Sequence, residues 1–396
     1  MARLMTIAYD AYYGTDAFPS YEYDWAGASA DILQETVNQR TGGACVKIDS
    51  AAANGTGYLT TSWGLLGENG YYKRNYLRFS ALPTSTVRVM TMETASVPLV
   101  GARLTAAGKL QLWNETGTPA QIGSDSAATI AVNTWYRIEL HCKTVTGASD
   151  TAGLRLDGTE VASATGLALS DVNTYQSKTG WLDPPGASKT VLIDDGAVNN
   201  DLDTQQNSYP GEGKVAYLYP TADSAIGANW VAGAGGTSNL WDALNATTPG
   251  GVAAGSATNT SQIKCTSGTS QDYDATLQTY TAAGVEGIVN VLQARVAWGP
   301  AGATGRTDAH KLVSNPAVTE ETMSVGAAAV GSFGTNWVTK WGAAQYTPSV
   351  TLGTAPVMRV SRRDAAATDM HVCSMSIAVD YTPSATSSYF TLLGIS

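Results

Sequence analysis

Apolar and polar residues alternate along many short stretches of the chain. The alternation is clearest over residues 134–143, where every second side chain is apolar and most of those between are charged or polar. The apolar set is Tyr136, Ile138, Leu140 and Cys142. Because the side chains of a β-strand point alternately to its two faces, this pattern predicts a half-buried strand. The next run, residues 153–163, contains Asp157-Gly158, a dipeptide that favours a tight hairpin turn.

Further strand-like runs recur in both halves, separated by clusters of Gly, Pro, Ser and Asn. Helical patterns are limited to residues 31–39 and 315–323, each too short to organise a domain. Many short strands joined by frequent turns are typical of β-sandwiches, so the predicted fold class is all-β. In residues 286–299 the side chains expected on one face are Ile288, Leu292, Ala294, Val296 and Trp298. The remaining runs are residues 40–49, 76–81, 85–93, 109–114, 189–199, 214–221, 355–363 and 371–383.

The length of the chain, 396 residues, suits two hydrophobic cores better than one. Residues 199–213 are polar, show no apolar period and contain a Pro-Gly turn, as linkers between domains do. We therefore expect two jelly-roll-like β-sandwich domains. The first covers residues 1–200, a linker follows at 201–213, and the second domain covers 214–396.

The charge pattern argues against two classes of partner. Acidic residues outnumber basic ones by 33 to 23, for a formal net charge of -10, and no basic stripe offsets the repulsion of a phosphate backbone. Nucleic-acid binding is therefore not expected. No window approaches the roughly 18 apolar residues of a membrane span, and the N-terminal residues do not resemble a cleaved signal. We expect neither membrane insertion nor export.

Motifs for catalysis are missing from the sequence. None of the three histidines accompanies a Gly-x-Ser-x-Gly nucleophile motif, and the four cysteines are too scattered for a zinc site or a disulfide framework. Glu22 and Asp24 come nearest to the paired carboxylates of a glycosidase, but the closing carboxylate of that motif is absent. The sequence therefore predicts a protein that is not an enzyme and has no organic cofactor.

Several segments carry a resemblance to a known family. In the first half they are residues 4–14, 40–48, 134–143, 154–163 and 191–201, and in the second half residues 215–230 and 270–280. In this order the first set resembles the concanavalin A-like, laminin-G-type lectin domains of bacteriophage virion proteins. The second set is similar to the C-terminal domains of phage structural proteins. The resemblance implies a concanavalin A-like first domain and a virion component of the head decoration or tail apparatus.

The resemblance also implies a candidate metal site. Laminin-G-type domains often hold calcium at the sandwich rim through carboxylate and carbonyl oxygens, and Asp194 and Asp195 in the closing strand are ligands of that kind. The alternative is that one of the two points to water while the other caps a strand end. Both interpretations stay open at the level of the sequence.

Aromatic residues suggest where a glycan would bind. The chain has 10 Trp and 19 Tyr against 4 Phe, and Trp and Tyr either stack on sugar rings or fill protein interfaces. Trp113, on the face opposite Leu110 and Leu112, and Trp181, in a turn-rich segment, are the members expected to be exposed. They are candidates for glycan binding. The alternative is that both pack on a neighbouring subunit or on the partner domain.

Two functional hypotheses follow. The first is a structural and adhesive protein of a bacteriophage virion, assembled in the host cytoplasm, that contacts other virion proteins and offers its lectin-like domain to host-surface glycans. It would form a homo-oligomer, and a trimer is favoured only by analogy with other surface appendages. The alternative is a secreted bacterial carbohydrate-binding module, which the missing export signal disfavours.

Overall fold

A computed structural model divides the described residues into two compact units, one containing those up to Gly213 and the other those from Lys214 onward. The described residues are 3–9, 24–26, 32–50, 55–63, 70–94, 97–145, 149–169, 176–202, 204, 206–232, 239–244, 262–266, 271–300, 306–313, 320–325, 338–341, 353–364 and 369–384.

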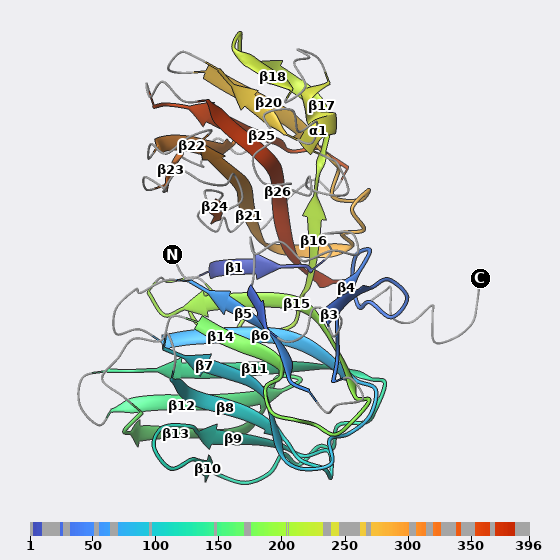
Figure 1. Cartoon of the computed structure of the whole chain (residues 1–396), viewed down its shortest axis with the longest axis vertical. Helices are drawn as coiled ribbons and strands as arrows, with labels where there is room; N and C mark the ends of the chain where they lie inside the picture. The colour runs from blue at the N-terminus through green and yellow to red at the C-terminus, as the bar shows by residue number, and fades with distance from the viewer. Residues whose placement is uncertain are drawn as a thin grey trace. The chain divides into compact units, whose positions relative to one another are not determined.

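The first unit is a sandwich of two antiparallel sheets (Figure 1). The eight-stranded sheet runs in the order β13 (Thr159–Leu167), β12 (Asp150–Leu156), β11 (Trp135–Lys143), β6 (Gly70–Phe79), β15 (Thr190–Asn200), β4 (Cys45–Asp49) and β3 (Ile32–Glu35), with β1 (Arg3–Ile7) also paired to β15. The seven-stranded sheet runs β10 (Ala120–Ile122), β9 (Leu110–Asn114), β8 (Pro98–Leu104), β7 (Val87–Glu93), β14 (Gln176–Trp181), β5 (Gly57–Ser62) and β2 (Asp24–Ala26).

Strand β11 shows why the alternating sequence folds this way. Its residues Ile138, Leu140 and Cys142 are buried, as the period-2 pattern predicts. The hairpin between β12 and β13 is also confirmed, because Asp157 and Gly158 both have positive φ angles, 50° and 84°. Two such residues in succession make the two-residue turn whose twist matches that of the strands.

Residues 201–213 do not behave as the linker expected from their polarity. They lie on the outer face of the eight-stranded sheet, and we call this segment the strap. The Tyr209 ring packs edge-on against Tyr72 and His141. The backbone N–H of Gly211 donates to Glu139 at 2.7 Å. The strap is polar because its backbone and side chains bind the polar outer face of a sheet, and it belongs to the first unit.

The second unit also contains two antiparallel sheets with one short helix, α1 (Leu240–Leu244) (Figure 1). One sheet runs β18 (Trp230–Ala232), β19 (Ile263–Cys265), β26 (Met370–Pro383), β21 (Gly287–Pro300) and β24 (Val338–Trp341), with β16 (Lys214–Leu218) also paired to β26. The other runs β17 (Pro220–Ile226), β20 (Gln271–Leu277), β25 (Val357–Arg362), β22 (Arg306–Leu312) and β23 (Glu321–Val325).

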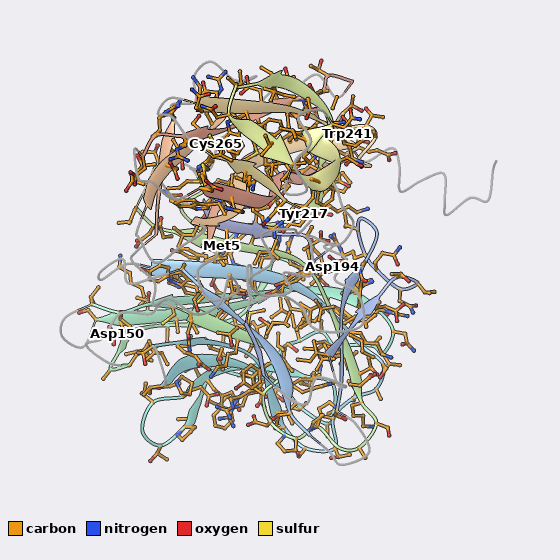
Figure 2. All side chains as sticks on the ribbon, turned by 45° about the horizontal axis from the view of Figure 1, so that its top comes forward. Met5, Asp150, Asp194, Tyr217, Trp241 and Cys265 are labelled. Carbon is orange, nitrogen blue, oxygen red and sulfur yellow. The ribbon has the colours of Figure 1, made fainter. Side chains whose placement is uncertain are left out.

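Apolar side chains from both of these sheets form one core, which includes Met358 of β25, Ile377 of β26 and Cys265, labelled in Figure 2. In β21, however, the predicted face is wrong at its start. Ile288 is 66% exposed, whereas Val289 is buried in the core. A β-bulge between Val289 and Val291 shifts the alternation by one residue, which the sequence period alone does not reveal.

The all-β fold predicted from the sequence is confirmed, and the helical patterns are not. Residues 32–35 of the first pattern form strand β3, and the described part of the second includes the start of β23. Cys45, Cys142 and Cys265 are free and buried. None of the described helices is long and apolar enough to cross a membrane.

Candidate functional site

The outer face of the seven-stranded sheet carries a row of polar and aromatic side chains that is interrupted by one glycine. On β14, Ser177 and Thr179 point inward, because their hydroxyls bind Lys73 and Asn75 of the opposite sheet. Lys178 between them therefore points outward. Strand register then places these residues side by side across five strands: Thr60 (β5), Lys178 (β14), Thr91 (β7), Gly101 (β8), Trp113 (β9), with Gln121 of β10 next to Trp113.

Three ion pairs lie along this row. The Lys178 ammonium contacts Glu93 at 2.8 Å, and the Arg103 guanidinium contacts Glu115 at 2.6 Å. The third pair joins Arg88 to Asp183 at 2.5 Å, with further contacts through Nε. The two glutamates are almost fully buried, while the cations are partly exposed, Lys178 to 23% and Arg88 to 27%.

The ion pair between Arg88 and Asp183 shifts the pKa of both partners. The hydrogen bonds that the Arg88 guanidinium donates to Asp183 raise the pKa of Arg88 above its ordinary value. Burial works to raise the pKa of Asp183, but the hydrogen bonds donated by Arg88 outweigh it and hold that pKa below the ordinary value. Both groups therefore stay charged over the whole physiological range.

Gly101 makes the second pair possible. A Cβ atom at this position would lie 2.5 Å from Oε1 of Glu115. Because glycine has no side chain, the Glu115 carboxylate can lie across β8 and reach Arg103 with two hydrogen bonds, at 2.8 and 2.6 Å. A glycine in mid-strand, which would otherwise weaken the sheet, here marks a close approach of a side chain.

Trp113 is the aromatic centre of this face. Its ring is half-buried, and the Arg103 guanidinium lies over it, 4.0 Å from the ring centroid. The indole N–H donates to Gln111 at 2.9 Å. Gln111 and Gln121 in turn both donate to the Asp125 carboxylate, at 2.7 and 3.0 Å. The indole is thus held in one orientation by hydrogen bonds and a stacked cation.

Of the two tryptophans expected to be exposed, the structure supports only Trp113. Leu110 and Leu112 are fully buried and Trp113 lies on the opposite face, as predicted. Trp181 is 0% exposed and packs between the sheets, its ring centroid 5.4 Å from that of Phe79. The prediction that Trp181 is exposed is therefore wrong. The turn-rich residues that suggested exposure follow Trp181 in the sequence, whereas the Trp181 indole itself packs in the core.

Asp194 and Asp195 do not form the expected rim site. Both are fully buried, and Asp194 is labelled in Figure 2. Asp194 accepts hydrogen bonds from the backbone N–H groups of Arg40 and Thr41, at 2.9 and 3.2 Å. Asp195 accepts from the Thr41 hydroxyl at 2.9 Å and pairs with the Arg40 guanidinium. Asp195 is thus already paired with a cation of the same chain, and Asp194 is occupied by backbone N–H groups.

A bulge explains why alternation fails for the two aspartates. The pairing of β15 with β6 shifts between Asp194 and Ala197, and Asp195 has a φ of 48°. Both side chains therefore turn toward Arg40 rather than to opposite faces. Among the described residues, no group of three or more His, Cys, Asp or Glu side chains could hold a metal ion.

The ion pairs of the outer face were missed at the level of the sequence. The alternation of QSKTGW and VRVMTME does place Lys178, Arg88 and Glu93 on polar positions of their strands. It does not say which strands are neighbours, and β14 lies between β5 and β7 although it is more than 80 residues away from β7 in sequence. The pairing is a property of the sheet order.

Comparisons with known proteins bear on the fold. No protein-family model and no curated protein matches the sequence. Solved structures that match include a glucuronan lyase from Trichoderma reesei (12% identity, 50% of this chain and 95% of that one, TM-score 0.38) and an alginate lyase from Aplysia kurodai (8%, 50% and 99%, 0.38). A third is domain 4 of an arabinanase from Geobacillus stearothermophilus in complex with arabinotriose (14%, 50% and 92%, 0.35). At identities of 8 to 14% and TM-scores of 0.35 to 0.38, these matches assign neither a family nor a ligand to the chain.

These matches correct one expectation. The sequence predicts a protein that is not an enzyme, but the solved structures that resemble the chain include polysaccharide lyases. That prediction is wrong. Missing catalytic motifs do not exclude an enzyme, because folds of this kind also occur in enzymes. At 8 and 12% identity the lyases do not assign an activity to this chain.

Proposed function

We propose that the chain binds glycans through the outer face of its seven-stranded sheet, as a component of a bacteriophage particle. The observation that carries this proposal is the arrangement around Trp113. A half-buried indole, fixed by Gln111 and Arg103, lies in a row of hydrogen-bonding side chains that crosses the sheet. An apolar ring edged by convergent polar groups is the composition that sugar recognition uses.

Several features support binding rather than a merely solvated sheet face. Glu93, Glu115 and Gln111 are buried although they lie on the outer side of the sheet. Their hydrogen bonds hold them in fixed positions, so a ligand would lose little side-chain entropy on binding. A solvated face would instead carry long, mobile side chains.

The particle setting rests on the resemblance of the chain's segments to phage virion proteins. In that setting the partners are other virion proteins and further copies of this chain, and the glycan belongs to the host surface. The alternative, a secreted bacterial carbohydrate-binding module, would use the same face. Mass spectrometry of purified phage particles separates them, because a virion component is present at a fixed copy number in each particle.

A pair of tryptophan variants tests the glycan-binding face. We expect Trp113→Ala to weaken retention on an immobilised neutral polysaccharide panel of dextran, mannan, xylan and arabinan about tenfold or more, because it removes the stacking surface. The matched control is Trp135→Ala, on β11 of the other sheet, which should bind as the unsubstituted chain does. Equal retention of both variants would contradict the proposal.

The same samples report on cleavage. After incubation with the chain, each polysaccharide is sized by gel filtration. Shortened products that disappear in Trp113→Ala would place an activity on this face, and intact products with retained binding would place binding alone there.

A further inference from the structure

We infer that the glycan bound by this face is electrically neutral, rather than a uronate, sulfated or phosphorylated polysaccharide. The inference rests on the proposed function and names the ligand class of that same site. It follows from how the charges of the outer face are arranged. No cation of this face that we describe is left without a carboxylate or carbonyl oxygen as its partner.

The charges on this face are matched. The cations with described contacts are Lys109, Arg88, Arg103 and Lys178, and the carboxylates with described contacts are Asp125, Asp183, Glu115 and Glu93. The strand register also places Asp24 of β2 opposite Thr60 of this face. Arg88, Arg103 and Lys178 each contact a carboxylate within 2.8 Å. The Lys109 ammonium donates to the Ala127 carbonyl at 2.7 Å, near Asp125. The described cations therefore leave no surplus of positive charge on this face to attract an anionic polymer.

An anionic glycan would meet a penalty here. To bind Arg103, a uronate carboxylate would have to displace Glu115, which is 1% exposed and hydrogen-bonded twice to that guanidinium. The displaced glutamate would be left buried without its counter-ion. If the uronate approached without displacing it, two carboxylates would share one cation, and like charges at close range repel.

A neutral sugar avoids both costs. Its hydroxyls can accept hydrogen bonds from the outward N–H groups of Arg103 and Lys178, which are partly exposed, without breaking an ion pair. The apolar C–H face of the ring can cover the part of Trp113 that Arg103 leaves open. The ion pairs then act as fixed dipoles that orient hydroxyl groups.

The experiment compares neutral and anionic polymers on the full chain. Dextran, mannan, xylan and arabinan form the neutral set, and alginate, polygalacturonate and heparin form the anionic set. We expect at least one neutral polymer to be retained about tenfold more strongly than every anionic one. This retention should depend little on salt between about 50 and 300 mM, a range over which the Debye length falls by roughly half. Strongest retention of an anionic polymer would overturn the inference and leave the proposed function standing. Retention of none would overturn both.

A charge-release variant tests the physical reason. Glu115→Gln is isosteric and leaves Arg103 without a counter-charge, so we expect it to gain salt-sensitive retention of alginate by about tenfold. Asp183→Asn, at a more exposed ion pair, should increase the retention of alginate in the same way through Arg88. It replaces the first variant if circular dichroism shows that Glu115→Gln does not fold. If the anionic polymers are retained equally by the unsubstituted chain and by both folded variants, charge pairing does not set the selectivity and the inference fails.

Discussion

Lys73 is a cation enclosed between the two sheets of the first unit. Its side-chain nitrogen donates to the hydroxyls of Thr61 and Ser177, at 3.0 and 2.6 Å, and no carboxylate among the described residues forms an ion pair with it. Burial lowers the pKa of Lys73 from its ordinary value to about 7. Two hydroxyl partners can satisfy the hydrogen bonds of a neutral amine, but they do not replace the water that hydrates a charged ammonium group.

This lysine makes stability depend on pH in a defined direction. Between pH 7 and the ordinary lysine pKa, the unfolded chain holds the proton and the folded chain does not, so the free energy of unfolding rises as pH increases. Below about pH 7 both states are protonated and the cost of the buried charge is fully present. We expect Lys73→Met to flatten this rise. The free energy of unfolding is measured in urea at about pH 6.5 to 9.5, a range that lies between the pKa of folded Lys73 and the ordinary lysine pKa and extends slightly below the former.

The control for this prediction is Lys178→Met. Lys178 is partly exposed and paired with Glu93, so its removal should leave the rise with pH in place. A rise that is equally steep in Lys73→Met and in the unsubstituted chain would show that Lys73 is not its source.

At the scale of elements, the strap and the two bulges decide where side chains point. The strap lies across β6, β11 and β12 through Tyr209, whose ring also receives the Arg155 guanidinium at 4.0 Å from its centroid. Burial raises the pKa of Tyr209 and lowers that of His141 to about 4. His141 is therefore neutral at physiological pH, and the contact between it and Tyr209 is not a charge switch in that range.

Gly153 of β12 is what allows Tyr209 to dock. A Cβ atom at residue 153 would come within 2.3 Å of the Tyr209 hydroxyl oxygen. We expect Gly153→Ala to displace the strap and to lower the free energy of unfolding by about 1–3 kcal/mol, measured in urea, with faster proteolysis at residues 201–213. Gly43→Ala is the matched control, since a Cβ there has no atom within 4 Å. Equal stability of the two variants would contradict this role of Gly153.

At the scale of the whole molecule, the boundary between the units follows the strap rather than the last strand of the first unit. Residues after Asn200 continue to bind the eight-stranded sheet: Asn199 donates to the Ser208 carbonyl at 2.8 Å, and Arg74 donates to the Gly211 carbonyl at 3.2 Å. The first sandwich is therefore complete only at Gly213.

Two truncations test this boundary. We expect a fragment of residues 1–213 to fold, and a fragment of residues 1–200 to melt roughly 5–10 °C lower, because it loses the strap and exposes Tyr72 and His141. Thermal unfolding followed by circular dichroism measures both. Identical melting temperatures would mean that residues 201–213 add nothing to the stability of the first unit and act as a linker after all.

Local patterns predicted the strands well and the site only in part. Strand β11, the Asp157-Gly158 hairpin and the outward position of Trp113 all follow from alternation and turn chemistry, which involve residues close in sequence. Trp181, Asp194 and Asp195 were misplaced. The indole fills the space between two sheets, and the aspartates sit in a bulge facing Arg40, more than 150 residues away.

What the sequence by itself determined is the all-β character of the chain, the faces of its regular strands, its acidic charge and the surface position of Trp113. These depend on the period of 2 and on composition. The tertiary structure alone decided which strands are neighbours, where bulges shift a face, and which carboxylate neutralises which cation. These features depend on the energies of pairing between residues far apart in sequence. A one-residue shift in register moves a side chain from the core to the surface, and the local sequence pattern does not reveal that shift.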